Sequence, residues 1–281
     1  MRTLASLMSA EFTTMRRNLF SIIMVLTLVL TVAGFYLIPD STHQDLGGAV
    51  AAADDAPELE AALAELPVRY LGEPRDPIGN RMSLIINLMV FEVLILPFVF
   101  IAVNLFQEKQ DGTIRAYRVT PGGTGRYLTA KMLLWTGLTI LYGVVLLLCT
   151  VGFGLSPASW AAMLLLLLVA GLFISAFGLF VALFFSSING WFLPGISLLL
   201  VSQLPIVSYL FPTFSPSWIT WFPTYRLLYA VRDILTIGPA GLMGPGDTIG
   251  GSYGYMAILA LAATIAAFAA TKRILMKEAR I

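Results

Sequence analysis

The sequence predicts an all-α integral membrane protein, and three observations support this fold class. Of the 281 residues, 58% are hydrophobic and only 12% are charged, which is about half the charged fraction of a soluble domain. Continuous apolar stretches such as Met163–Ala170 lack the alternation of barrel strands. The apolar residues also gather into six runs that each suit one membrane-spanning helix. These runs lie near residues 19–38, 82–105, 130–152, 160–185, 190–211 and 253–271.

The distribution of basic residues predicts that both termini lie in the cytoplasm. With this orientation 12 of the Lys and Arg residues fall inside and 5 fall outside. Positively charged loops are preferentially retained in the cytoplasm, so we expect the N-in, C-in topology. The net charge of +1 hides this asymmetry. No basic stripe is interleaved with aromatic residues, so nothing favours a nucleic-acid partner. We expect one transmembrane domain over residues 1–281.

The first element is predicted to be an interfacial helix over residues 1–18. Leu4, Met8, Phe12 and Met15 recur at helical spacing, while serine, threonine and arginine occupy much of the other surface. Such a helix suits the inner membrane surface. The alternative is a frayed start of the first span. That span is too long for the apolar core of a cleaved signal peptide, so we interpret it as a signal anchor.

An acidic outer loop is predicted over residues 39–81, after the first span. It carries nine carboxylates, and Pro57–Glu65 is expected to form one short helix with proline at its start. The loop is too small for a catalytic domain. Its acidity suits either attraction of a cationic substrate or simple solvation.

Two tight turns organise the middle of the chain. Phe153–Ser159 is predicted to be an outer hairpin and Ser186–Asn189 an inner one. Short connections place consecutive helices side by side and antiparallel. Residues 130–211 are therefore expected to form a compact up-down-up bundle.

The segment 212–252, between spans five and six, is predicted to hold two short outer helices. Ser215 and Pro216 suit a helix start, and Pro223 breaks the aromatic stretch that follows. Aromatic residues concentrate at membrane interfaces, so these helices are expected at membrane depth. The stretch contains Trp218, Trp221, Phe222, Tyr225 and Tyr229. No internal repeat supports an inverted-repeat transporter.

Several kinds of chemistry are not supported by the sequence. The chain has no phosphate-binding G-x-x-x-x-G-K-[ST] loop, so we do not expect it to hydrolyse ATP by itself. His43 is its one histidine and Cys149 its one cysteine. Neither a zinc site, nor a Ser-His-Asp triad, nor an intramolecular disulfide framework can be built from them. We expect no catalytic residue, metal or cofactor on this chain.

One polar segment, residues 106–129, interrupts the apolar runs on the inner side. Asp111 or Thr113 can cap a short helix over residues 114–119, and Pro121-Gly122-Gly123 stops it. Ile114 and Tyr117 then share one face, whereas Arg115 and Arg118 share another. Such a helix can dock a soluble partner, with its apolar tip in a cleft and its arginines on the rim. The alternative is an ordinary solvated loop.

Polar residues inside the spans form a second candidate site. Glu92 lies near the middle of the second span, where an acidic side chain costs roughly 2.5–3.5 kcal/mol on insertion, so it should face the bundle interior or a cavity. Asn87 and Gln203 are further intramembrane polar residues. The three can line a translocation path, or Glu92 can be a neutral, hydrogen-bonded packing residue. Pro97 and Pro205 are expected to kink their spans.

The polar segment also resembles a known loop. Gln107-Glu108, Gly112-Thr113-Ile114, Thr120-Pro121, Leu128 and Lys131 are similar to the first cytoplasmic loop of type-2 ABC exporter permeases. The resemblance extends to the six spans, the N-terminal interfacial helix and the aromatic helices before the last span. Bacterial drug exporters, including fluoroquinolone-type permeases, are similar in size. The Pro121-Gly122-Gly123 sequence departs from the family, in which an apolar residue often follows the proline.

This resemblance implies a permease dimer, formed with a second copy or a sister chain, in a bacterial cytoplasmic membrane. Two separate ATPase subunits would hold ATP and Mg and dock on the coupling helix. The expected cargo is a drug or another amphiphilic, lipid-like compound. The alternatives are a membrane-embedded enzyme using Glu92 or the outer carboxylates, and a non-transporting sensor or assembly component. The implied coupling residues are Glu108, Gly112, Thr113, Ile114, Arg115, Tyr117, Arg118 and Pro121.

Overall fold

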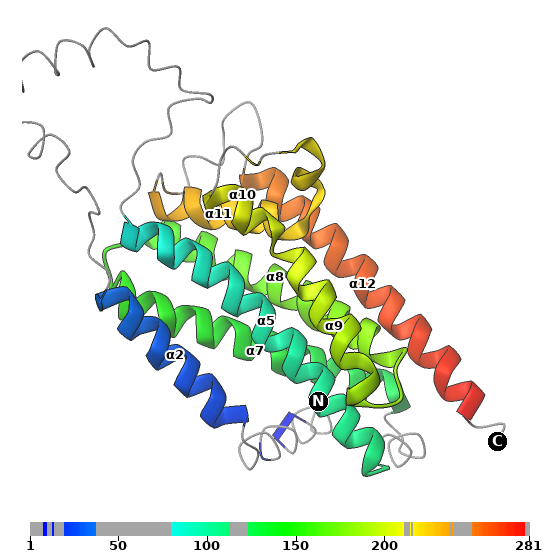
Figure 1. Ribbon diagram of the computed structural model, residues 1–281. Helices are drawn as coiled ribbons and strands as arrows, with labels where there is room; N and C mark the ends of the chain where they lie inside the picture. Colours follow the sequence, from blue (N-terminus) through cyan, green and yellow to red (C-terminus); the bar gives the residue numbers. More distant parts are fainter. Residues whose placement is uncertain are drawn as a thin grey trace, which may run out of the picture.

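All regular secondary structure in the described part of the chain is helical (Figure 1). The structure is a computed structural model that describes residues 8, 9, 13, 20–37, 80–112, 123–210, 214, 216–236, 238 and 249–278. Most of the predicted interfacial helix, the acidic loop with its Pro57–Glu65 helix, and residues 113–122 lie outside these ranges. Five helices in the described part are long and apolar enough to cross a membrane, and a shorter apolar helix covers Ile22–Leu37.

The long helices follow the predicted apolar runs, but two of them begin or end in polar sequence. The run near 82–105 becomes part of a helix that continues to Gln110, and the run near 130–152 belongs to a helix that starts at Gly123. Polar residues at both ends of segment 106–129 are therefore helical. The long elements are α2 (Phe20–Leu37), α5 (Asn80–Gln110), α7 (Gly123–Thr150), α8 (Pro157–Leu183), α9 (Ile188–Ser202) and α12 (Ile249–Glu278).

Consecutive long helices run in alternating directions. The Tyr36 hydroxyl near the end of α2 donates to the Cys149 carbonyl near the end of α7, 2.8 Å away. At the opposite end of the bundle, Lys109 near the end of α5 contacts the end of α8. The hairpin between α7 and α8 forms as predicted, with Ser156 capping α8 ahead of Pro157. This alternation agrees with a chain that crosses a membrane repeatedly.

The centre of the bundle is α8, which contacts α5, α7, α9, α11 and α12. Two of its glycines allow neighbouring helices to approach closely. A Cβ on Gly178 would lie 2.8 Å from Cγ2 of Ile101 on α5, and one on Gly171 would lie 3.2 Å from Cγ2 of Thr136 on α7. Small residues at such crossings are what close helix packing in a bilayer requires.

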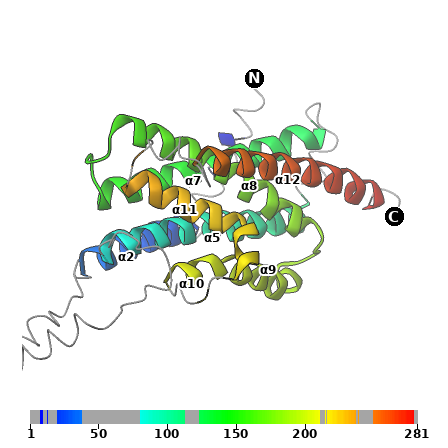
Figure 2. The same ribbon diagram turned by 90° about the horizontal axis from the view of Figure 1, so that it is seen from above.

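Helix α9 contacts both α5 and α8 and lies beside α10 at one edge of the bundle (Figure 2). Trp191 of α9 is buried, with its ring centroid 5.7 Å from that of Phe98 and 6.2 Å from that of Phe106. Residues 130–211 therefore have the expected up-down-up order but do not form a separate compact unit, because their third helix also packs against α5. A large aromatic side chain anchors that third helix to α5.

The fifth span is interrupted at Gln203, between α9 and α10 (Leu204–Leu210). Pro205 has no amide hydrogen to donate to Val201, and the amide of Ile206 donates to Gln203 instead of Ser202. The Ser202 carbonyl accepts a hydrogen bond from the Thr224 hydroxyl. The expected kink near Pro205 is thus present as a one-residue interruption at Gln203, and a neighbouring helix satisfies the Ser202 carbonyl.

The two predicted aromatic helices are present, with different starts. A 3-10 helix, η1, covers Ser217–Trp221, and α11 covers Pro223–Thr236. Ser215-Pro216 does not start a helix as expected, because Pro216 occupies the cap position of η1 and provides no side-chain cap. Pro223 is the first residue of α11, where its fixed φ and missing amide hydrogen are tolerated. Helix α11 crosses the bundle near the starts of α5 and α12 (Figure 1).

Candidate functional site

The helical stems of the polar inner segment are joined by a buried ion pair. The Lys131 ammonium on α7 lies 2.8 Å from Oε1 of Glu108 on α5. The Lys131 side chain is 0% exposed and that of Glu108 is 14% exposed. Lys131 also donates to the Asn104 side chain, and the Tyr127 hydroxyl donates to Glu108. We call these four residues the stem cluster.

Helical spacing explains how the stem cluster forms. Asn104 and Glu108 are four residues apart on α5, and Tyr127 and Lys131 are four apart on α7, so each pair shares one helix face. A buried ammonium is tolerated only when its charge and its hydrogens find partners. Two side-chain oxygens do this here, and the Tyr127 ring centroid lies 5.2 Å from the Lys131 ammonium. Removing either charge would leave the other poorly compensated.

Lys109 ties the same end of α5 to α8. Its ammonium donates to the Phe185 carbonyl at 2.7 Å and to the Ala182 carbonyl at 3.4 Å. These carbonyls lie at or just beyond the C-terminus of α8, where exposed acceptors and the helix dipole favour a cation. Consecutive residues of α5 therefore bind two different helices: Glu108 binds α7 and Lys109 binds α8.

Gly112 marks where the first stem ends. Its φ is +69°, a left-handed conformation that glycine adopts without a Cβ penalty and that commonly ends helices. Of the predicted coupling residues, the structure thus places Glu108 in the stem cluster and Gly112 at the end of α5. Thr113, Ile114, Arg115, Tyr117, Arg118 and Pro121 lie outside the described residues.

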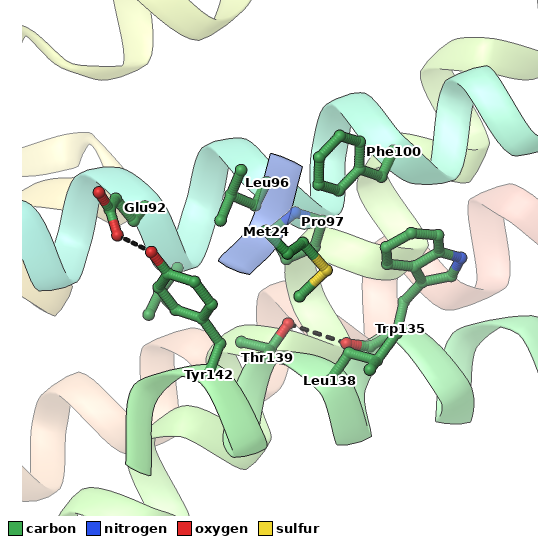
Figure 3. A pocket seen from close by; sticks show the side chains of 10 residues that line it. Met24, Glu92, Leu96, Pro97, Phe100, Trp135, Leu138, Thr139 and Tyr142 are labelled. Atoms are coloured by element: carbon green, nitrogen blue, oxygen red, sulfur yellow. Dashed lines mark hydrogen bonds between the residues drawn. The ribbon is translucent and has the colours of Figure 1, made fainter. Parts of the chain in front are cut away.

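Glu92 forms a separate polar cluster in the middle of the bundle. Its carboxylate accepts hydrogen bonds from the Thr31 hydroxyl on α2 and the Tyr142 hydroxyl on α7 (Figure 3 shows the second). Glu92 is 8% exposed. The residue therefore joins three helices, in keeping with the expectation that it faces the protein interior.

The cavity beside Glu92 is far too small for an amphiphilic substrate. It holds about 10 Å³ and is lined by Met24, Pro97, Trp135 and Tyr142 among others (Figure 3), roughly the volume needed by one water molecule. Neither Asn87 nor Gln203 lines it. The Asn87 amide donates to the Ser83 carbonyl of its own helix at 2.7 Å, and that of Gln203 lies 3.4 Å from the Ser202 hydroxyl. The three polar residues do not share one cavity in this structure.

Sequence reasoning missed most partners in both clusters. Asn104, Tyr127, Thr31 and Tyr142 were not singled out. The four-residue spacing of Asn104 with Glu108, and of Tyr127 with Lys131, is a signal that was present in the sequence. The Thr31–Glu92 contact joins residues 61 positions apart, and no local spacing indicates it.

The comparisons with known proteins support a transporter. A family model described as ABC-2 family transporter protein matches residues 56–269, which include all of α5, α7, α8 and α9 and most of α12. The comparison with curated proteins found no match. The matched region includes the stem cluster, Glu92 and the aromatic helices η1 and α11. This chain, with its multiple apolar helices, belongs to the ABC-2 family of transporter proteins and is a transmembrane permease subunit of an ABC transporter.

Proposed function

We propose that this permease exports a drug or another amphiphilic, lipid-like compound, and that ATPase subunits drive it by docking on residues 106–121. The stem cluster is the observation that carries the proposal. It joins both stems of that segment through a buried, hydrogen-bonded ion pair. A polar solvated loop does not require such a junction, whereas a segment that receives mechanical work does.

The contacts of the stem cluster define a route for movement. Displacement of the segment would act on α5 and α7 together, because the ion pair of Glu108 and Lys131, with 2.8 Å between Oε1 and Nζ, joins the two helices at this point. It would also act on α8, because Lys109 binds the carbonyl of Phe185. Since α8 contacts five other helices, displacement there reaches the rest of the bundle. Coupling of this kind needs a contiguous physical network, which these contacts supply.

The remaining parts of the assembly are also proposals. ATP and Mg would be bound by the ATPase subunits, with no cofactor on the permease. Two permeases, either identical or sister chains, would form the pathway in a bacterial cytoplasmic membrane. The low charge of the spans supports an amphiphile over a polar metabolite. Asn87, Gln203 and Glu92 remain candidates for the path, although the hydrogen bonds of Glu92 favour a bracing role across α2, α5 and α7.

The proposal predicts that acidic residues at Ile114 and Tyr117 prevent ATPase docking. The double variant Ile114→Asp/Tyr117→Asp should lose copurification with the ATPase and substrate-stimulated ATP hydrolysis, because charges would replace the apolar tip. Membrane insertion should be unchanged. Lys272→Asp/Arg273→Asp is the control, since both residues are exposed on a different helix, α12. If the Ile114/Tyr117 variant copurifies with its ATPase and exports normally, the docking proposal is wrong.

A further inference from the structure

A polar pocket lies between α11 and the start of α12, at the end of the bundle predicted to face outward. Its volume is about 120 Å³. Arg226, Tyr229, Arg232 and Asp233 line it from α11, and Ser252 lines it from α12. We call it the arginine pocket. It lies opposite the end of the bundle that holds the stem cluster, so the proposed coupling mechanism does not use it.

Among the described side chains that line the arginine pocket, guanidinium groups outnumber carboxyl groups. Two guanidinium groups face one carboxyl group, and burial raises the pKa of Asp233 although Arg232 opposes the shift. The Arg226 guanidinium lies 5.9 Å from the Tyr255 ring centroid, and that of Arg232 lies 5.9 Å from the Tyr229 ring centroid. The buried Nε of Arg232 has no hydrogen-bond partner among the described residues. These features suit an acidic group, because guanidinium groups bind carboxylates and phosphates with paired hydrogen bonds.

A larger apolar cavity lies among α5, α8, α9, α11 and α12, and it is open at the side where Leu198 and Val201 of α9 are exposed. Its volume is about 440 Å³, within the range of small-molecule sites. Phe98, Phe173, Phe177, Leu199 and Ala263 are among its lining residues. Its one polar lining side chain, Ser202, donates its hydroxyl hydrogen to the Leu199 carbonyl at 2.7 Å. The cavity therefore suits a hydrocarbon group.

The arginine pocket and the apolar cavity follow each other along the same helix faces. Ser252 lines the first, and Leu259 and Ala263 line the second; these positions are 7 and 11 residues after Ser252 and so share one face of α12. Seven residues of helix span about 10 Å. On α11, Pro223 lines the cavity and Arg226, three residues on, lines the pocket. One elongated molecule can therefore reach both.

Tyr255 lies between the two spaces on that face of α12. Its hydroxyl donates to the Trp221 carbonyl at 2.6 Å, while its ring lies beneath the Arg226 guanidinium. These contacts fix an aromatic side chain where the polar lining changes to an apolar one. An amphipathic ligand has its own polar–apolar boundary at the same place, next to its head group.

We propose that the two spaces form one site for a single-chain amphiphile with an acidic head group, which the arginine pocket binds while the chain fills the apolar cavity. This inference deepens the proposed export function and rests on it for the role of the site in transport. The head-group chemistry is a carboxylate or phosphate, and its source is a free amphiphile. A bilayer phospholipid is the competing source.

Binding can be measured on the full chain in neutral phosphatidylcholine nanodiscs with palmitate carrying a mid-chain diazirine. We expect photolabelling of α8 or α12 segments that line the cavity, and competition by unlabelled palmitate. Hexadecanol should compete at least about tenfold more weakly, because it cannot form the charge-assisted hydrogen bonds. Acetate and inorganic phosphate, which lack the chain, should not compete. Equal competition by hexadecanol, or labelling elsewhere, would overturn the proposal.

Amino-acid substitutions test separately the binding of the ligand's head group and the binding of its hydrocarbon chain. Arg226→Gln/Arg232→Gln should weaken palmitate binding about tenfold or more, whereas Arg81→Gln, outside both spaces, should not. Asp233→Asn should strengthen binding by removing the opposing carboxyl group, a gain that misfolding cannot produce.

Ala263→Leu should fill the cavity and reduce labelling, whereas Ala269→Leu on the exposed surface of α12 should not. Unchanged binding in both the arginine and the Asp233 variants would contradict the assignment.

Two further measurements distinguish a free amphiphile from a bilayer lipid, and the ligand site from the export function. If added anionic phospholipid competes as well as palmitate does, the site belongs to a bilayer lipid and the proposal is wrong. ATPase copurification, measured on the same preparations, tests the export function independently. Palmitate binding without ATPase association would reject the proposed function and leave the site intact. ATPase association without palmitate binding would reject the site alone.

Discussion

Glu92 and Lys131, two buried ionisable residues in the described part of this permease, are both close to groups that stabilise them. Lys131 is fully buried, yet its ammonium contacts Glu108 and Asn104. Glu92 is almost as buried and accepts hydrogen bonds from two hydroxyl groups. Satisfied polar groups in a low-dielectric interior fix the relative positions of the helices that carry them. The stem cluster thus fixes α5 against α7 at one end, and Glu92 does so near mid-span.

Substitutions of Glu92 distinguish a bracing role from a pathway role. Glu92→Leu leaves the Thr31 and Tyr142 hydroxyl groups without an acceptor, and each buried unsatisfied group costs about 1–3 kcal/mol. The thermal denaturation midpoint of Glu92→Leu should fall clearly. The midpoint of Glu92→Gln should fall less, because glutamine keeps an acceptor oxygen. Transport by Glu92→Gln should keep its pH profile and substrate range. Loss of transport at unchanged stability would assign Glu92 to the path instead.

Asp233 should make stability depend on pH. Burial raises the pKa of this carboxyl group in the folded state, so the folded protein binds a proton more readily than the unfolded chain. The contribution of Asp233 is therefore fully present below its unfolded pKa of about 3.9 and is lost as pH rises through the folded pKa. Asp233→Asn should exceed the wild type in denaturation temperature at neutral pH, and the difference should shrink on acidification. A difference that grows on acidification would show that the Arg232 interaction dominates.

At the residue scale, the sequence could show which side chains needed partners but not which partners they found. An acidic residue in the middle of an apolar run must face the protein, and Glu92 does. The partners of Glu92 come from α2 and α7, and finding them requires the rotation and depth of three helices. Glu108 and Lys131 belonged to one family-like sequence pattern, but their pairing depends on how closely α5 and α7 approach.

At the scale of elements, close helix packing depends on small residues of α8. Gly171 brings the backbone of α8 against Thr136 and Thr139 of α7, and Gly178 brings it against Phe98 and Ile101 of α5. The core formed there includes Trp135, Leu166 and Leu167, which are almost fully buried. Packing of this kind tolerates added volume poorly.

Gly171→Leu should therefore destabilise the bundle by about 1–3 kcal/mol or more through overpacking. Gly137→Leu provides a matched control, because a Cβ at Gly137 has no atoms within 4 Å apart from its immediate backbone surroundings. Thermal denaturation of both variants in the same detergent gives the comparison. Equal midpoints for the two variants would show that the α7–α8 approach is not as close as described.

The sequence predicted helices where hydropathy and proline positions indicated the same element. It did not predict the residues at which those helices begin and end. Pro223 separates η1 from α11, as the aromatic segment predicted. Helix α5 continues past its apolar run to Gln110, because hydropathy marks where lipid contact ends, not where the helix ends. Gly112 provides the stop. The packing of α9 on α5 was missed because chain order alone placed α9 with α7 and α8, whereas Trp191 fits between phenylalanines of α5.

For the whole molecule, the contacts suggest how work done at one end can alter a site at the other. The stem cluster and Lys109 join the polar segment to α5, α7 and α8. Helices α5 and α8 extend from that end to α11, with which both are in contact. They also line the apolar cavity through Phe98, Phe173 and Phe177. Movement of these two helices would change the proposed ligand site directly.

The number of substrate molecules exported per ATP hydrolysed, in vesicles holding the permease and its ATPase, tests the central claim that the stem cluster couples docking to movement. Lys131→Met breaks the ion pair but leaves Ile114 and Tyr117 intact, so the ATPase should still bind and hydrolyse ATP. Arg126→Met, an exposed position on the same helix, is the control. We predict that Lys131→Met lowers the ratio at least about tenfold, as expected for loss of an interaction worth 1.4 kcal/mol or more, while Arg126→Met leaves it unchanged. A folded, ATPase-bound Lys131→Met permease with the wild-type ratio would contradict the claim.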